Sequence, residues 1–388
     1  MSVPQLLGGL DPTGGVPLLA AIAAYRSRPG IEDALLGQLP GEPLDASDFS
    51  ALVRDARLQR MLGLLAAMIM DGELPVTTDQ ELELQEPLLA ALCGDLVRER
   101  ELVELVTLLD SEGVDHRVLK GPAVAHLDYA DPALRSFADV DLLVRSAQWD
   151  DAMRVLCASG WRRAFQEPRP GFERRFVKSM VLTRPDGPTE LDLHRTLALG
   201  PFGLSVDLED LWQQPEQLVL GAARNLKALD VDLRFIHSCF HAMLGDLPPR
   251  LVPLRDVAEL ACSPRLRAER VVALARSWRA EAVIAAALQM AWRTLRLKPY
   301  PLVTDLEARL VVPARQRKAL EGYLSPRRSY VGLTLSATRA LRRPSDVANY
   351  LVALAFPARE FIDGRYASRS DRWRQAARSL ANRRGRTR

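Results

Sequence analysis

Hydrophobic residues recur at helical spacing over the first third of the chain. Apolar side chains three and four positions apart predict helices over residues 58–70 and 86–111. Asp45, directly before a further apolar-periodic stretch, is typical of a helix N-cap. The helix over 86–111 is expected to end near Glu112-Gly113, because glycine often follows the last helical residue. Residues 1–113 are therefore predicted to form an N-terminal helical region.

The pattern changes over residues 114–200, where short apolar runs and turn residues favour strands. The Asp186-Gly187 dipeptide lies between two such runs and predicts a hairpin. This stretch is thus a predicted mixed α/β core. Its expected strands are 116–119, 140–144, 161–165, 176–183 and 189–194, and its expected helices are 123–129 and 147–159.

Helical spacing returns after residue 200. Segments separated by prolines predict helices over 226–244, 254–262, 267–297 and 305–323. Residues 201–364 are therefore predicted to be a C-terminal helical region, and 365–388 a separate basic tail. Taken together, the elements predict an α+β fold with a small mixed sheet framed by helices.

Composition narrows the class of protein. The chain has 388 residues, of which 48% are hydrophobic and 26% are charged, as is usual for a globular protein in water. It has no apolar run of about 18 residues and no basic-then-apolar start, so we expect no membrane span and a cytoplasmic location. The four cysteines are widely separated, which favours buried thiols over a disulfide framework or a zinc site.

The last 24 residues are strongly basic. From Arg365 to Arg388 the chain holds nine arginines and one acid, Asp371. Such a run can bind nucleic acid, but it is more often a solvated helix end or tail. Nucleic acid therefore remains a less favoured partner.

Three carboxylates in the predicted core point to a cation. Asp139 and Asp141 lie two residues apart in a predicted strand, so their side chains share one face of the sheet. Asp192 lies between two leucines in a later strand, and Glu190 alternates onto the same face as Asp192. The pattern indicates a divalent cation site, or else a strand edge whose carboxylates face water.

Several motifs resemble a known family. Leu119-Lys-Gly-Pro-Ala-Val-Ala, Tyr129-Ala-Asp-Pro-Ala-Leu-Arg135, Phe137-Ala-Asp-Val-Asp-Leu-Leu-Val144 and Glu190-Leu-Asp-Leu-His194 resemble the uncharacterised nucleotidyltransferase family, a branch of the polymerase-β-like nucleotidyltransferase superfamily. The resemblance covers about 115–197, with a weaker echo at 237–241 and 254–257. It implies a polymerase-β-like core that moves a nucleoside monophosphate from an NTP to an acceptor.

The resemblance also implies roles for the acids. Asp139, Asp141 and Asp192 would be catalytic and would hold Mg²⁺, with two ions expected and Mn²⁺ as a substitute. Asp192 would lie nearest the acceptor, as a general base or a metal ligand. Glu190 would be an accessory carboxylate at most.

Lys120, Gly121 and Arg135 would contact the nucleotide. Lys120-Gly121 lies between a predicted strand and a predicted helix, a position at which backbone N–H groups can bind phosphate. However, Pro122 stands where the wider superfamily usually has serine, and proline has no N–H to donate. Arg135 would neutralise triphosphate charge or, in a structural role, pair with Asp131 or with the aspartates of the site.

Three histidines are candidate accessory residues. His194 follows the third carboxylate, and a structural role is favoured for it. His237 and His241 share one face of a predicted helix. With Asp256 they could form a separate metal site, but packing against the α/β core and lining its cleft is the preferred interpretation.

The sequence thus predicts a magnesium-dependent nucleotidyltransferase. ATP is the default donor because no base-reading signature is visible, and the acceptor is a small molecule, peptide or protein, for example a biosynthetic intermediate. Two alternatives stay open: an inactive relative that binds or scaffolds, and a transferase directed at nucleic acid through the basic tail.

Overall fold

A computed structural model describes residues 11–13, 17–185, 187, 189–325, 336–341, 343–363 and 374. The arginine-rich tail predicted at 365–388 lies outside the described residues except for Arg374, as does Asp186 of the predicted hairpin turn.

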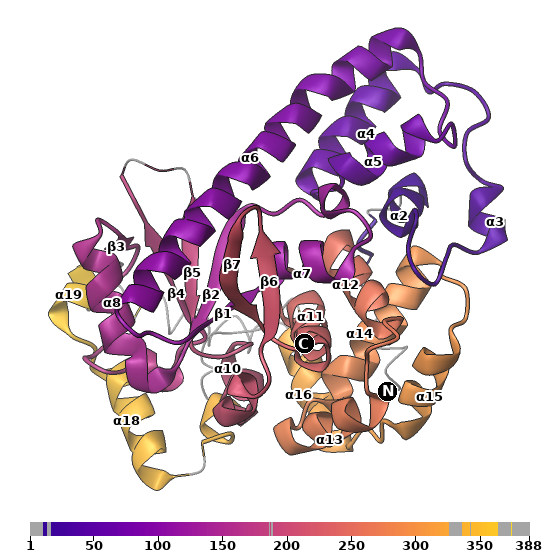
Figure 1. The fold of residues 1–388 in the computed structure, drawn as a ribbon. Coiled ribbons are helices and arrows are strands. Elements are labelled where there is room, and N and C mark those ends of the chain that lie inside the picture. The colour runs from indigo at the N-terminus through magenta and orange to yellow at the C-terminus, as the bar shows by residue number, and fades with distance from the viewer. Residues whose placement is uncertain are drawn as a thin grey trace.

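A seven-stranded mixed sheet forms the centre of the fold (Figure 1). Parallel pairing joins β2 to β5 and β1 to β7, and the remaining neighbours are antiparallel. The strand order is β3-β4-β5-β2-β1-β7-β6. The strands are β1 (His116–Leu119), β2 (Asp139–Val144), β3 (Arg162–Arg163), β4 (Ser179–Thr183), β5 (Glu190–His194), β6 (Glu216–Leu220) and β7 (Ala223–Ala228).

The β4–β5 hairpin predicted from the sequence is confirmed by antiparallel pairing from Ser179↔His194 to Thr183↔Glu190. The pairing of β5 with β2 then sets the position of the acids. Asp141 lies opposite Asp192, and Asp139 opposite Glu190. Chain segments about fifty residues apart therefore present their carboxylates side by side.

The expected helix over 226–244 was wrong at its start. Leu226 and Ala228 belong to β7, which pairs with β6 and β1, and α11 begins only at Val231 after the N-cap Asp230. The alternating apolar residues of β6 and β7 are buried in the core of the sheet together with Val118 of β1. An apolar spacing of two can be read as part of a helical pattern when the strands are short.

Two other predicted helices are each divided. The stretch 267–297 forms α13 (Ala268–Trp278) and α14 (Glu281–Leu295), separated by Arg279, whose φ is 57°. The stretch 305–323 forms α15 (Pro301–Arg309) and α16 (Ala314–Leu324), with Pro313 before the second helix. Apolar spacing continues across both breaks, so periodicity alone does not show them.

The longest helix, α6 (Thr78–Ser111), covers one face of the sheet together with α8 (Trp149–Ala158) (Figure 1). It begins at Thr78 rather than Glu86, because Thr77 and Gln80 form a reciprocal capping box. Leu102, Leu105 and Leu109 of α6 pack with the buried residues of β2. This helix supports the strand that carries two of the aspartates.

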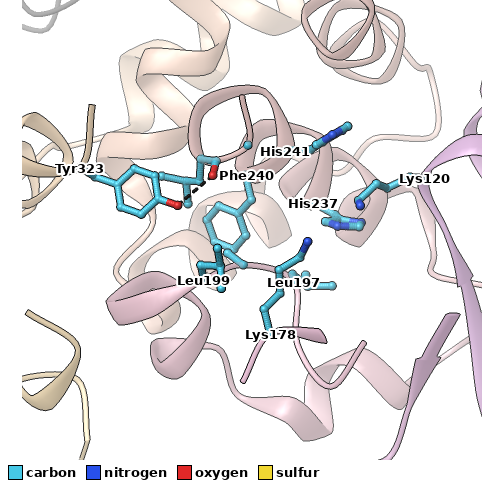
Figure 2. A pocket seen from close by; sticks show the side chains of 11 residues that line it. Lys120, Lys178, Leu197, Leu199, His237, Phe240, His241 and Tyr323 are labelled. Carbon is cyan, nitrogen blue, oxygen red and sulfur yellow. Dashed lines mark hydrogen bonds between the residues drawn. The ribbon is translucent and has the colours of Figure 1, made fainter. Parts of the chain in front are cut away.

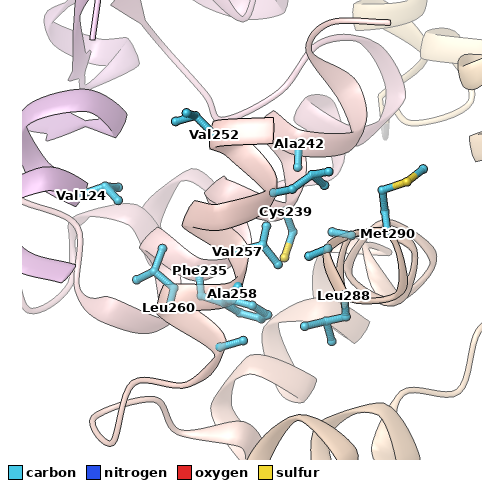
Figure 3. Packing of buried hydrophobic residues seen from close by; sticks show 14 of the residues in the cluster. Val124, Phe235, Cys239, Ala242, Val252, Val257, Ala258, Leu260, Leu288 and Met290 are labelled. Atoms are coloured by element: carbon cyan, nitrogen blue, oxygen red, sulfur yellow. The ribbon is translucent and has the colours of Figure 1, made fainter. Parts of the chain in front are cut away.

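Helices α7 (Lys120–Asp128), α11 (Val231–Leu244) and α12 (Leu251–Ala261) lie on the opposite side and belong to a larger helical core. Figure 3 shows part of this core, in which Cys239 and Val257 lie close together. The remaining helices are α2 (Pro17–Ala24), α3 (Asp33–Leu36), α4 (Ala46–Leu58), α5 (Leu62–Met70), α9 (Glu173–Phe176), α10 (Gly200–Ser205), α18 (Pro344–Ala355) and α19 (Arg359–Asp363), with 3₁₀ turns η1 (Pro132–Leu134), η2 (Ser146–Gln148) and η3 (Leu208–Trp212).

The predicted α+β architecture, a mixed sheet framed by helices, is confirmed. Cys239 and Cys262 are buried as expected, whereas Cys93 and Cys157 are exposed. Within the part of the chain that the structure describes, no helix combines the length and the apolar character that crossing a bilayer requires.

Candidate active site

The centre of the candidate site is a cluster of Asp141, Asp192 and His194. His194 lies two residues after Asp192 on β5, so both side chains point to the same face. Its Nε2 atom is 2.8 Å from Oδ1 of Asp141 and 3.0 Å from Oδ2 of Asp192. On the other side of the ring, Nδ1 lies 3.2 Å from the carbonyl oxygen of Thr196, which can accept a hydrogen bond from it. Nε2 therefore faces two anionic oxygens, an arrangement that a proton or a metal ion on this nitrogen would stabilise.

Two lysines neutralise the carboxylates. Lys120 Nζ lies 2.5 Å from Oδ1 of Asp141, and Lys178 Nζ lies 3.5 Å from Oδ2 of Asp192. Burial would raise the pKa of Asp141, but Lys120 and His194 outweigh burial and hold this pKa well below its usual range. The pKa of Asp192 is also lowered, since His194 and Lys178 outweigh its burial. Both carboxylates are thus ionised at neutral pH.

The surroundings shift the pKa values of the two lysines in opposite directions. Burial would lower the pKa of Lys120, but Asp141 and Asp192 outweigh it and raise this pKa. Burial and the nearby Lys120 charge lower the pKa of Lys178. Lys178 was not among the predicted site residues, because its approach to Asp192 depends on the register of the β4–β5 hairpin.

Asp139 lies at the rim of the cluster. Its side chain is 40% exposed, and Oδ1 is 3.7 Å from Nη1 of Arg60, which lies between α4 and α5. Glu190, the accessory candidate beside it on β5, is exposed. Of the three predicted catalytic aspartates, the structure thus brings Asp141 and Asp192 into direct proximity and keeps Asp139 at the edge.

The cluster has the chemistry of a divalent-cation site. The ligand atoms of Asp141, Asp192 and His194 all lie within 4.8 Å of one another. Oδ1 of Asp192 is buried and has no hydrogen-bond partner among the described residues. Carboxylate oxygens suit Mg²⁺, and an imidazole nitrogen extends the range to Mn²⁺. The residues present therefore fit the group that the resemblance implies.

The Lys120-Gly121 turn joins β1 directly to α7, as predicted. Lys120 has a φ of 43°, and Pro122 lies in the first turn of the helix, where a missing N–H costs little. Gly121 is needed for packing, since an added Cβ would lie 2.8 Å from Cβ of Phe137. The close approach that glycine permits here is therefore to a side chain of the protein.

Arg135 is part of a buried network. Its Nε and Nη2 atoms donate to Asp256 at 3.1 and 2.8 Å, and Nη1 donates to the carbonyl oxygen of Ser136 at 2.8 Å. Tyr129 donates its hydroxyl to the same Asp256 carboxylate at 2.8 Å. Arg135 thus pairs with neither Asp131 nor the site aspartates, and its donors are directed into the helical core.

His237 and His241 line a cavity of about 260 Å³ beside the cluster. In Figure 2, Lys120 and Lys178 lie on the same side of this cavity as His237, while Phe240 and Tyr323 form its apolar wall. This agrees with the preferred prediction that the histidine helix lines the cleft. Because Asp256 is already bound by Arg135 and Tyr129, the separate His237–His241–Asp256 metal site does not form among the described residues.

His237 is the more deeply buried of the two, at 3% exposure, and its Nε2 has no partner among the described residues. Its ring centroid is 6.2 Å from that of His194. Burial, reinforced by the positive charge of Lys120, holds the pKa of His237 well below its ordinary value. His237 therefore presents a neutral ring next to the cavity.

Comparisons with known proteins indicate the family of the chain. Residues 45–296 match the family described as uncharacterised nucleotidyltransferase. An antigenic nucleotidyltransferase-like protein from Paracoccidioides brasiliensis aligns at 18% identity and a TM-score of 0.32, covering 53% of this chain and 93% of that one. No curated protein matches the sequence. The family match spans more than half of the chain and includes every residue of the cluster and the helix that carries both cavity histidines, so the protein belongs to the uncharacterised nucleotidyltransferase family.

Proposed function

We propose that this protein is a metal-dependent nucleotidyltransferase that moves a nucleoside monophosphate, with AMP from ATP as the first case to test, to a nucleophile on an acceptor. The pairing of β2 with β5 carries the proposal, because it places Asp141 against Asp192 beside a cavity and leaves a buried carboxylate oxygen without a partner. Membership of a nucleotidyltransferase family supports it.

Asp141, Asp192 and His194 would hold the divalent ion, Mg²⁺ or Mn²⁺, and Asp139 at the rim would contribute to a second ion. A bound ion of this kind neutralises phosphate oxygens and lowers the pKa of an attacking hydroxyl. Arg135 would not contact the nucleotide, because its guanidinium donates to Asp256 and to the carbonyl oxygen of Ser136.

Lys120 and Lys178 would bind phosphate oxygens, since both ammonium groups border the carboxylates and the cavity. Because Pro122 contributes no backbone donor to the turn, phosphate binding would depend more on the two lysine side chains. In the transfer, the acceptor oxygen forms a bond to the α-phosphorus as the bond to pyrophosphate breaks. Neutral His237 would accept a hydrogen bond from the acceptor hydroxyl within the cavity, and the proton of that hydroxyl would leave with the pyrophosphate.

The test combines binding with product analysis. Calorimetry with ATP and Mg²⁺ or Mn²⁺ should show metal-dependent binding to the wild type, and Asp192→Asn should lose it, whereas Glu190→Gln, an exposed carboxylate on the same strand, should retain it. Mass spectrometry of candidate acceptors after incubation with each NTP should show the mass of an added monophosphate. Absence of metal-dependent nucleotide binding by the wild type would refute the proposal.

A further inference from the structure

A second cavity, of about 490 Å³, lies between the end of β5, the segment 203–209 and the start of α18. None of its lining residues lines the cavity beside the acid cluster. Its polar lining includes Ser146, Arg175, Arg195 and Arg343, and Leu204 and Leu341 contribute apolar surface.

Arg195 is the unusual residue of this cavity. It directly follows His194, so alternation along the chain turns its side chain away from the acid cluster. Arg195 is only 6% exposed; its Nε donates to the carbonyl oxygen of Val177 at 2.9 Å, but its buried Nη2 has no partner among the described residues. Burial lowers its pKa to about 10, and no acidic side chain of the described residues offsets this effect. The guanidinium is thus a buried cation that has no counter-ion in the part of the chain that the structure describes, which costs stability.

A second unpaired donor borders the same cavity. The hydroxyl oxygen of Ser146 is buried and has no hydrogen-bond partner among the described residues. A guanidinium and a hydroxyl that both lack partners form a donor set suited to an oxyanion. Two unsatisfied polar groups on one cavity are difficult to attribute to packing, because buried polar groups are nearly always paired.

The acidic residues that line the cavity are already engaged. Glu209 pairs with Arg145 at 3.2 Å, and Asp346 pairs with Arg175 at 2.5 Å. Asp207 accepts the backbone N–H of Glu209 at 3.2 Å. These acids therefore balance other groups and leave the charge of Arg195 available to a ligand.

The outer wall of the cavity is held in place by packing. Tyr350 of α18 stacks on Phe172, with ring centroids 5.7 Å apart, and meets Phe176 edge-on. Beyond the helix, the N–H of Ala358 donates to the carbonyl oxygen of Pro168 at 2.7 Å. Helix α18, which carries Asp346 in its first turn, is thus held against residues 168–176.

We propose that this cavity binds an organic oxyanion, a phosphate or carboxylate group attached to a small apolar moiety, with Arg195 and Ser146 as its donors. The apolar part would contact the leucines that complete the lining. This site is separate from the proposed nucleotidyl-transfer site and does not depend on catalysis by that site.

The experiment is a binding titration of the full chain with phenyl phosphate, benzoate and inorganic phosphate, followed by calorimetry and by thermal unfolding. The three probes distinguish a phosphate from a carboxylate and show whether the apolar group contributes. Arg195→Met should weaken binding by about tenfold or more, as expected for loss of a charge-assisted hydrogen bond. Ser146→Ala should weaken it less. Arg154→Met, which removes an exposed arginine on α8, should leave it unchanged.

Two further variants keep the result interpretable. Lys120→Met should retain anion binding, because Lys120 lines only the cavity beside the acid cluster; loss of binding in this variant alone would assign the anion to that site and overturn the proposal. If Arg195→Met does not fold, Arg195→Lys, which keeps the charge but loses the planar fork, replaces it and should also bind the anion more weakly. Wild-type protein that binds none of the probes, or an Arg195 variant that binds as well as the wild type, would show that Arg195 has only a structural role.

Discussion

At the scale of single residues, protonation of His237 makes the stability of the fold depend on pH. Its pKa is well below the ordinary value because of burial, with added effects of Lys120, His194 and Lys178 that Asp141 only partly offsets. The folded state therefore keeps this ring neutral, while the unfolded chain takes up a proton near pH 6.5. Stability from this residue is complete above that pH and is lost as the pH falls towards the folded-state pKa.

We expect the free energy of unfolding to fall below pH 6.5 by up to about 1.4 kcal/mol per pH unit from His237 alone. His237→Gln should reduce this slope. Urea denaturation at pH 7.5, 6.0 and 5.0 measures it, and an identical pH dependence in the variant would contradict the assignment.

The buried ion pair between Asp256 and Arg135 determines how strongly a substitution of either residue destabilises the fold. Asp256→Leu would leave the guanidinium of Arg135 without its partner in the core, and we expect a loss of about 3–5 kcal/mol. Because Arg135→Met removes the unpaired charge, the double variant should be more stable than Asp256→Leu alone. Chemical denaturation of the two single variants and the double variant gives the coupling energy, and strictly additive losses would argue against direct pairing.

At the scale of elements, the junction of β1 and α7 is constrained by the ring of Phe137. Gly121→Ala would place a Cβ within 2.8 Å of that residue, so we expect about 1–3 kcal/mol of destabilisation from overpacking. Gly322→Ala is the matched control: it lies within α16, where no described residue outside its own turn of helix comes within 4 Å of an added Cβ, and it should be neutral or stabilising. Equal effects of the two substitutions in thermal unfolding would show that the contact with Phe137 is unimportant.

The strands of the sheet show which parts of the fold and of the site could be predicted from the sequence. Alternation within one strand is a local property, so the shared face of Asp139 and Asp141 and the hairpin before Asp192 could be predicted. The pairing of Arg135 with Asp256 joins positions 121 residues apart and leaves no local pattern. The approach of Lys178 to Asp192 depends on the register of the β4–β5 hairpin, which the sequence does not specify. Strands β6 and β7 form a local hairpin, but their apolar residues fit the start of a helical pattern, so they were not recognised as part of the sheet.

At the scale of the whole molecule, a ligand that binds only the folded chain must raise its stability. If Asp141, Asp192 and His194 bind a divalent ion, Mg²⁺ or Mn²⁺ at one hundred times its dissociation constant should add about 2.7 kcal/mol to the free energy of unfolding. Asp192→Asn should abolish this increment, whereas Glu190→Gln should keep it. Thermal unfolding over a metal titration tests this without any substrate, and an equal increment in the Asn variant would place the ion elsewhere.

Helix α6 is long enough to turn a small rotation at the sheet into a larger displacement at its far end. With 34 residues and a rise of about 1.5 Å per residue, this helix, which includes Pro87, is about 50 Å long, with one end behind β2 and the other among the N-terminal helices (Figure 1). A tilt of about 5° at the sheet would displace the far end by about 4 Å for a rod of this length. Distance measurements between labels on α4 and on the sheet would thus magnify movements near the two aspartates that are too small to see at the site itself.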